Sequence, residues 1–127
     1  MQAQTLLLIG AGGAVGAVGR YLLGRGMVHL MGPGFPWGTL AANVIGAFVM
    51  GLLVELLAVK FNLSQAWQAG LTVGLLGGFT TFSAFSLETA LMIERNDWGL
   101  AAIYVIASVL LCVVALFAGL YIVRTLA

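Results

Sequence analysis

Thirteen residues, "GGFTTFSAFSLET" from Gly77 to Thr89, combine side chains that a purely lipid-facing segment does not need. The run holds a glycine pair, phenylalanine rings three residues apart and several hydroxyl groups. Glycine tolerates backbone angles that other residues resist, and a hydroxyl oxygen can cap the helix that resumes after a break. We therefore predict a helix broken near Gly77-Gly78. The hydroxyls that follow the break are those of Thr80, Thr81, Ser83 and Ser86.

Such a break can bind ions of either sign. Freed backbone carbonyls suit a hard cation such as Na⁺, whereas amides and hydroxyls suit an anion. Phe79, Phe82 and Phe85 recur every three residues, and an aromatic ring is positive at its edge. A ring turned edge-on into a narrow pore could therefore contact a small dehydrated anion. Packing in the core or against lipid would explain the same rings, so both interpretations stay open.

Two further groups of polar residues interrupt apolar stretches. Asn43 lies one turn after Thr39 on the same helix face, and polar side chains at membrane depth are costly and usually mark function. The alternative for Asn43 is an interhelical hydrogen bond that serves packing alone. Tyr104, Ser108 and Cys112 are spaced by four and share a face. A serine can also bond back to its own helix, so this stripe alone decides nothing.

The charged residues allow more than one role. Arg20 ends the first apolar stretch, where it could reach the lipid headgroups or form the cationic entrance of an anion path. Glu55 and Glu88 are either interfacial carboxylates or proton or cation sites, which keeps a transporter open. His29 has no cysteine or carboxylate at ligand spacing, so we predict a solvated side chain and not a metal ligand.

Four membrane-spanning helices must position these residues. Of the 127 residues, 62% are hydrophobic and 7% are charged, and a bilayer crossing takes roughly 20 apolar residues. The uncharged stretches are Met1–Gly19, Gly26–Val54, Phe61–Leu87 and Trp98–Val123. We predict an all-α membrane protein with one domain, residues 1–127. Its expected spans are 4–24, 37–59, 66–94 with a break at 76–80, and 98–124.

Several classes of function are excluded by the residues present. The sequence has no serine, histidine and carboxylate constellation, no metal-ligand spacing and no phosphate loop, so we predict that it is not an enzyme. A dinucleotide-binding G-x-G-x-x-G fails because Val15 takes the third glycine position. Gly12 and Gly16 instead have the spacing of helix contacts. The opening "MQAQTLLLIG" lacks a basic region, so we expect no removable signal peptide.

The distribution of basic residues gives almost no orientation signal. With four crossings, Lys60 and Arg124 lie on one side, and Arg20, Arg25 and Arg95 lie on the other. Basic residues near span ends normally set orientation, so this near balance would let the chain insert both ways. Two opposite copies could then pair as an antiparallel homodimer. A single, weakly biased topology remains the alternative.

The sequence resembles a known family of membrane proteins. "GGFTTFSAFSLE" is similar to the GG-x-TTFS-x-FS-x-E motif of the CrcB/Fluc fluoride channels, and "GRYLLG" and "PWGTLAANVIG" also agree. The resemblance covers essentially the whole chain. It implies a dual-topology homodimer in the inner cell membrane, with two antiparallel pores that let cytoplasmic F⁻ escape passively and reject Cl⁻. It also implies a structural, untransported Na⁺ held by the backbone carbonyls of Gly77 and Thr80.

The resemblance further implies a fluoride pathway. Its members are an amide, two rings, an arginine at the entrance and several hydroxyls. They are Asn43, Phe82, Phe85, Ser108, Tyr104, Thr39, Arg20, Thr81 and Ser83. Two positions depart from the family pattern, because Cys112 replaces a hydroxyl with the weaker donor of a thiol and Ala84 has no hydroxyl.

Two other functions remain as alternatives. A small multidrug-type exporter driven by protons is also a four-span protein, but it needs a carboxylate deep in a span, and the first span has none. A non-transporting assembly subunit is the other alternative. It would give no reason for the placement of Asn43 and the phenylalanines.

Overall fold

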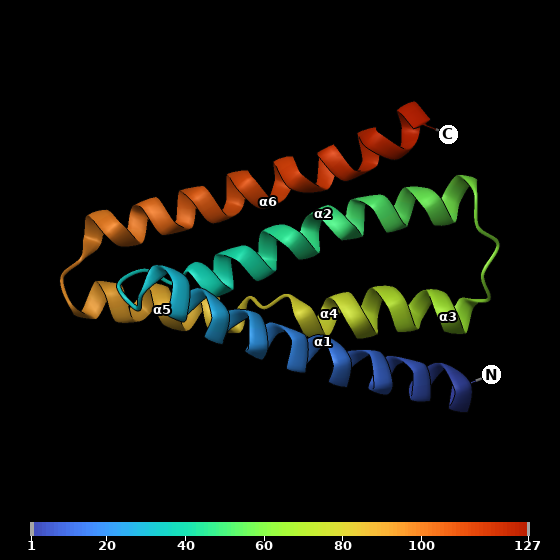
Figure 1. The fold of residues 1–127 in the computed structure, drawn as a ribbon, viewed down its shortest axis with the longest axis horizontal. Helices are drawn as coiled ribbons and strands as arrows, with labels where there is room; N and C mark the ends of the chain where they lie inside the picture. Colours follow the sequence, from blue (N-terminus) through green and yellow to red (C-terminus); the bar gives the residue numbers. More distant parts are fainter. Residues whose placement is uncertain (1, 127) are drawn as a thin grey trace.

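The computed structural model describes residues 2–126, and the described chain is helical with short connections (Figure 1). Three spans are continuous helices and the third is built from several pieces. The continuous helices are α1 (Gln2–Met31), α2 (Trp37–Val59) and α6 (Trp98–Leu126). The third span comprises α3 (Gln65–Ala69), the π-helix η1 (Gly70–Leu76), α4 (Gly77–Phe79) and α5 (Ser83–Glu94).

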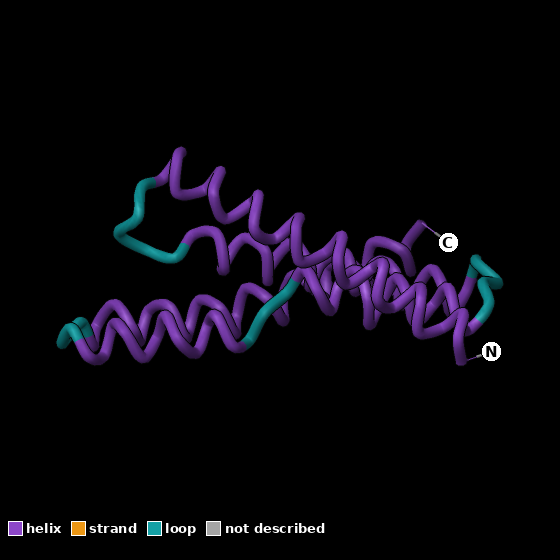
Figure 2. The backbone as a smooth tube through the Cα atoms, turned by 90° about the horizontal axis from the view of Figure 1, so that it is seen from below, coloured by secondary structure: helices purple, strands orange, loops and turns teal. Residues whose placement is uncertain are grey.

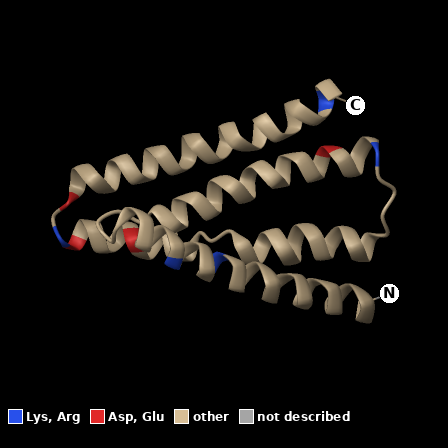
Figure 3. Cartoon of the chain, in the orientation of Figure 1, with Lys and Arg blue, Asp and Glu red and all other residues tan. Residues whose placement is uncertain are grey.

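The four spans are long and apolar enough to cross a membrane, which confirms the predicted class. Both ends of the chain lie beside the connection between α2 and α3 (Figure 1), as an even number of crossings requires. Most charged residues lie toward the two ends of the bundle, and apart from one basic position of α1 the middle is uncharged (Figure 3). A hydrocarbon layer fits around that middle, because charges there would be costly. The chain is therefore a multi-pass membrane protein.

The first helix is longer than its predicted span. It continues to Met31, seven residues beyond the predicted end at residue 24. The left-handed Gly32, with φ of 84°, then ends it, and the Gly32 N–H donates to the Val28 carbonyl at 2.8 Å. Such a glycine is a common way to close a helix. His29 consequently lies in the last helical turn and not in the expected loop, with an exposed side chain.

The third span is broken, as predicted, but not at Gly77-Gly78. Both glycines are helical in α4, and the interruption is 80–82, where Thr80 is extended with φ −88° and ψ 159°. Figure 2 shows this segment as a loop between two helical halves within the bundle. Gly78 serves close packing instead, because a Cβ on it would lie 2.6 Å from the carbonyl oxygen of Gly13 in α1, whereas Gly77 is exposed.

Small residues bring the helices into two close pairs. In α1, a Cβ on Gly12 would lie 2.5 Å from the Gly70 carbonyl oxygen, so the packing role predicted for the α1 glycines is confirmed. Gly51 of α2 and Gly119 of α6 likewise face backbone atoms of each other's helix. Backbones that approach this closely gain dispersion contacts that lipid tails cannot replace. The result is a pair of α1 with the first half of the third span (α3, η1 and α4) and a pair of α2 with α6.

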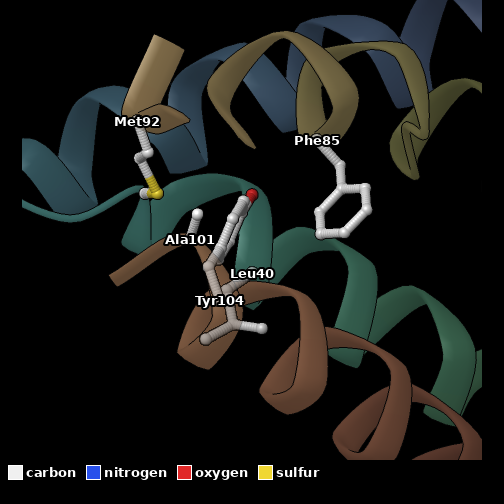
Figure 4. Packing of buried hydrophobic residues seen from close by; sticks show 5 residues of the cluster. All are labelled: Leu40, Phe85, Met92, Ala101 and Tyr104. Carbon is white, nitrogen blue, oxygen red and sulfur yellow. The ribbon is translucent and has the colours of Figure 1, made fainter. Parts of the chain in front are cut away.

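A compact apolar cluster joins α2, α5 and α6 (Figure 4). Its members are all buried, and Tyr104 is fully so, with 0% of its surface exposed. They are Leu40, Phe85, Met92, Ala101 and Tyr104. Phe35 and Trp37, at the start of α2, pack against this cluster. The cluster anchors α5 to the α2–α6 pair and so fixes where the broken segment lies.

Candidate functional site

The side chain of Asn43 bridges to the broken segment. Its Nδ2 donates to the Thr81 carbonyl at 3.0 Å, and the Thr81 N–H donates to its Oδ1 at 2.7 Å. The interhelical bond considered for Asn43 is therefore present, and it replaces the peptide partners that Thr81 would have in a continuous helix. An amide nitrogen carries two N–H groups, and the bond to Thr81 uses one of them.

Thr81 also restarts the helix. Its Oγ1 accepts the Ala84 N–H at 3.1 Å, as a capping residue does at the first turn, and lies 3.3 Å from the Ser83 hydroxyl. In a continuous helix the Thr81 and Ala84 N–H groups would bond to the carbonyls of Gly77 and Thr80. The break therefore takes the ordinary helical donor away from both carbonyls.

A third contact at the break comes from α1. The Arg20 Nε donates to the Gly78 carbonyl at 3.5 Å. The guanidinium thus lies beside the freed carbonyls and does not simply extend to the membrane surface. Thr80 closes the preceding helix, because its N–H and its hydroxyl both donate to the Leu76 carbonyl at 3.0 Å.

The two phenylalanines after the break have different surroundings. Their ring centroids are 5.4 Å apart with planes tilted by 43°. Phe85 is 9% exposed and also contacts the Tyr104 ring, with centroids 5.0 Å apart, whereas Phe82 is 76% exposed. Their sequence spacing did not predict this difference. Phe85 belongs to the core cluster, and Phe82 presents its ring to whatever lies outside the single chain.

A groove of about 440 Å³ runs between α2, the broken segment and α6. It brings five predicted pathway residues together: Asn43, Thr81, Phe82, Phe85 and Ser108. Ser108 is 6% exposed, and within the part of the chain described its hydroxyl oxygen has no hydrogen-bond partner. It does not bond back to its own helix, which was the alternative considered. A buried donor without a partner normally indicates that a water or an ion belongs there.

Glu88 accepts hydrogen bonds from two of the hydroxyls predicted for the pathway. The Thr39 hydroxyl donates to its Oε2 and the Tyr104 hydroxyl to its Oε1, both at 2.8 Å. A half-buried carboxylate needs such donors to offset its lost hydration. Sequence reasoning treated Glu88 as a residue near a span end and missed this pairing. The signal available in the sequence was that the family motif ends with this glutamate, which marks it as part of the site.

A second cavity, of about 680 Å³, opens at the end of the bundle beside the connection from α1 to α2. Basic side chains from α1 and from the connection after α5 line it together with Thr39 and Glu88. The basic residues are Arg20, Arg25, His29 and Arg95. Thr39 and Arg20 therefore line this basic cavity and not the groove, and Ser83 lines neither. Tyr104 also lines neither space, but its ring contacts Phe85 of the groove and its hydroxyl donates to Glu88 of the basic cavity.

Comparison with known proteins shows which family the chain belongs to. Residues 7–120 match the family described as "CrcB-like protein, Camphor Resistance (CrcB)". The chain belongs to the CrcB family. This confirms the resemblance drawn from the motif.

Curated relatives in the CrcB family match nearly end to end. A "Fluoride-specific ion channel FluC" of Caulobacter vibrioides is 58% identical over 120 residues, 94% of each chain. One from Phenylobacterium zucineum is 58% identical over 95% of this chain and 96% of its own. One from Agrobacterium fabrum is 50% identical over 95% and 97%. By name these CrcB relatives are channels and not enzymes, in agreement with the prediction.

Proposed function

We propose that this protein is a fluoride-selective channel through which cytoplasmic F⁻ leaves the cell passively across the inner membrane. The observation that carries the proposal is the buried hydroxyl of Ser108, which has no hydrogen-bond partner among residues 2–126 and lies in the groove it shares with Asn43. Relatives that are 50% and 58% identical bear the name of fluoride channels, which supports the same substrate.

The groove has the chemistry that a small halide needs. Fluoride is tightly hydrated, so a pathway must replace its water with hydrogen-bond donors. The Ser108 hydroxyl and the second N–H of the Asn43 amide can donate into the groove. The rings of Phe82 and Phe85 can offer their positive edges. A narrow passage between such rings excludes a larger halide sterically.

The basic cavity fits the entrance of this pathway. Arg20, Arg25 and Arg95 line it, and clustered like charges raise the local concentration of the opposite ion. Arg20 also bonds to the Gly78 carbonyl, so its positive charge lies near the break. Anions would collect here before they pass the Phe85–Tyr104 contact toward the groove.

The assembly is proposed to be an antiparallel homodimer with two pores. Non-helical backbone at membrane depth is tolerated only where protein or water covers it, yet Phe82 of the broken segment and the helical residues Gly77 and Ser83 on either side of it are exposed in the single chain. A second, opposite copy at this face would cover the broken segment. The near balance of basic residues between the two sides is compatible with insertion in both orientations.

A central Na⁺ fits the carbonyl oxygens present at the break. The carbonyls of Gly77 and Thr80 have lost their ordinary helical donors, as described above, and neutral oxygens suit a hard cation. With two antiparallel copies, a symmetric contact would present each carbonyl twice. Bound there, the cation would supply positive potential to both pores without being transported.

The test is the flux of F⁻ and Cl⁻ from liposomes that contain the purified protein. We expect a selective F⁻ leak that is lost in Phe82→Ile and Asn43→Ala. Thr72→Val is a matched control, because the Thr72 hydroxyl bonds back to the Gln68 carbonyl within its own helix. Liposomes that stay tight to F⁻, or that release Cl⁻ equally fast, would overturn the proposal.

A further inference from the structure

The groove contains the only thiol of the chain. Cys112 of α6 lines it one turn after Ser108 on the same helix face, and its side chain is only partly buried. A lone thiol in a helix is most often a packing residue. In this groove, however, it shares the wall with side chains that are already expected to face an ion.

A second sulfur lies in the same wall. Met50 of α2 also lines the groove. Its neighbour Gly51 packs against the backbone of Leu116, which is one turn beyond Cys112. Gly119 in turn packs against the backbone of Phe48. One helical turn is about 5.4 Å, so Met50 lies somewhat more than one turn beyond the level of Cys112 along the α2–α6 pair, and both side chains line the same groove. The remaining lining residues include no histidine, aspartate or glutamate.

The Ser108 hydroxyl provides an independent indication that the groove holds a ligand. It is more than nine-tenths buried, lines the groove and has no partner within the described residues. Water or an ion at this point would satisfy it. A small hydrated cation therefore has a polar position in this groove, one turn before Cys112 on the same helix.

We propose that Cys112 and Met50 form a site for a soft monovalent metal cation, Ag⁺ or Cu⁺, and that its occupation blocks the groove. Thiolate and thioether sulfurs select such cations, whereas carboxylates and imidazoles, absent from this lining, would select harder ones. On binding, the Cys112 S–H bond breaks, an S–Ag bond forms and the proton leaves to water. The Met50 thioether sulfur binds Ag⁺ through a lone pair, and no bond of the methionine breaks. The predicted block of fluoride flux rests on the proposed channel function, whereas the predicted binding of Ag⁺ does not.

The experiment uses Ag⁺ on the purified protein in liposomes with chloride-free buffers, so that silver stays in solution. We expect Ag⁺ to lower F⁻ efflux about ten-fold or more and excess dithiothreitol to restore it. Cys112→Ser and Cys112→Ala, each compared with the same variant without Ag⁺, should lose the block. Met50→Leu, which nearly keeps the volume, should weaken Ag⁺ binding about ten-fold.

A displaced thiol is the matched control. Cys112→Ser combined with Ser86→Cys keeps a single thiol but moves it to an exposed position of α5 outside the groove. A block of this variant equal to that of the native chain would overturn the site. So would unchanged block in Cys112→Ser, or Ag⁺ binding that is unaffected by Met50→Leu.

Mass spectrometry of the detergent-solubilised protein separates this inference from the proposed function. A single Ag⁺ per chain, lost in Cys112→Ser, supports the site even if the liposomes conduct no fluoride, in which case the channel proposal fails alone. Selective fluoride flux with no Ag⁺ bound would overturn the site and leave the channel proposal standing.

Discussion

The pairing between Asn43 and the Thr81 peptide makes a quantitative prediction about stability. Asn43→Ala removes two hydrogen bonds, of 3.0 and 2.7 Å, and leaves the Thr81 N–H and carbonyl without them at the break. A typical intramolecular hydrogen bond contributes about 1 kcal/mol net, and interhelical bonds in membranes average about 0.6 kcal/mol. The expected loss in the free energy of unfolding is therefore about 1–2 kcal/mol.

Asn43→Asp separates the two bonds. The carboxylate keeps an acceptor for the Thr81 N–H but has no N–H to give to the Thr81 carbonyl, so we expect it to hold the first bond only. Thr72→Val is again the control, since it removes a bond within one helix, and we expect a loss below about 0.5 kcal/mol.

The measurement is reversible unfolding in mixed detergent micelles, followed by circular dichroism. Fluoride efflux from liposomes is measured on the same preparations. If Asn43→Ala is as stable as the native chain, the side chain does not hold the break and the reasoning from its two bonds is wrong. If stability falls but flux per folded protein is unchanged, Asn43 is a structural residue and its second N–H does not serve the pathway.

Four further predictions concern the other polar and charged groups. Ser108→Ala should lower fluoride efflux. Its free energy of unfolding should stay equal or rise by about 1 kcal/mol, because the substitution removes a buried hydroxyl that has no partner among the described residues. A destabilised variant would refute this prediction. Glu88→Gln should cost about 1–2 kcal/mol, because one of the two accepting oxygens becomes an amide nitrogen, which only donates and leaves the Thr39 or the Tyr104 hydroxyl without its acceptor. Fluoride flux in the native chain should also be indifferent to an imposed pH gradient; a proton-driven flux abolished by Glu88→Gln would favour the exporter. Glu55→Gln should change stability by less than about 1 kcal/mol, because its partner at 3.0 Å, the arginine of the last helical turn, is mostly exposed.

Much of the architecture followed from the sequence because it depends on local composition. Apolar stretches of sufficient length must span a bilayer and must be helical there, since each backbone group needs a partner within its own segment. The spans, the packing role of the α1 glycines and the presence of a break were predictable on that basis. The motif from Gly77 to Thr89 was specific enough to indicate the family, which the comparisons confirmed.

The tertiary structure decided which partner each polar group has. Gly77 and Gly78 could have formed the break by their conformational freedom, but both are helical, Gly78 packs closely against Gly13 of α1, and the break lies at 80–82. Phe82 and Phe85 are equivalent in spacing, yet only Phe85 meets the core cluster. Sequence spacing describes one helix at a time. Burial, hydrogen-bond partners and the pairing of Glu88 with two hydroxyls arise between helices, where only their packing determines which groups meet.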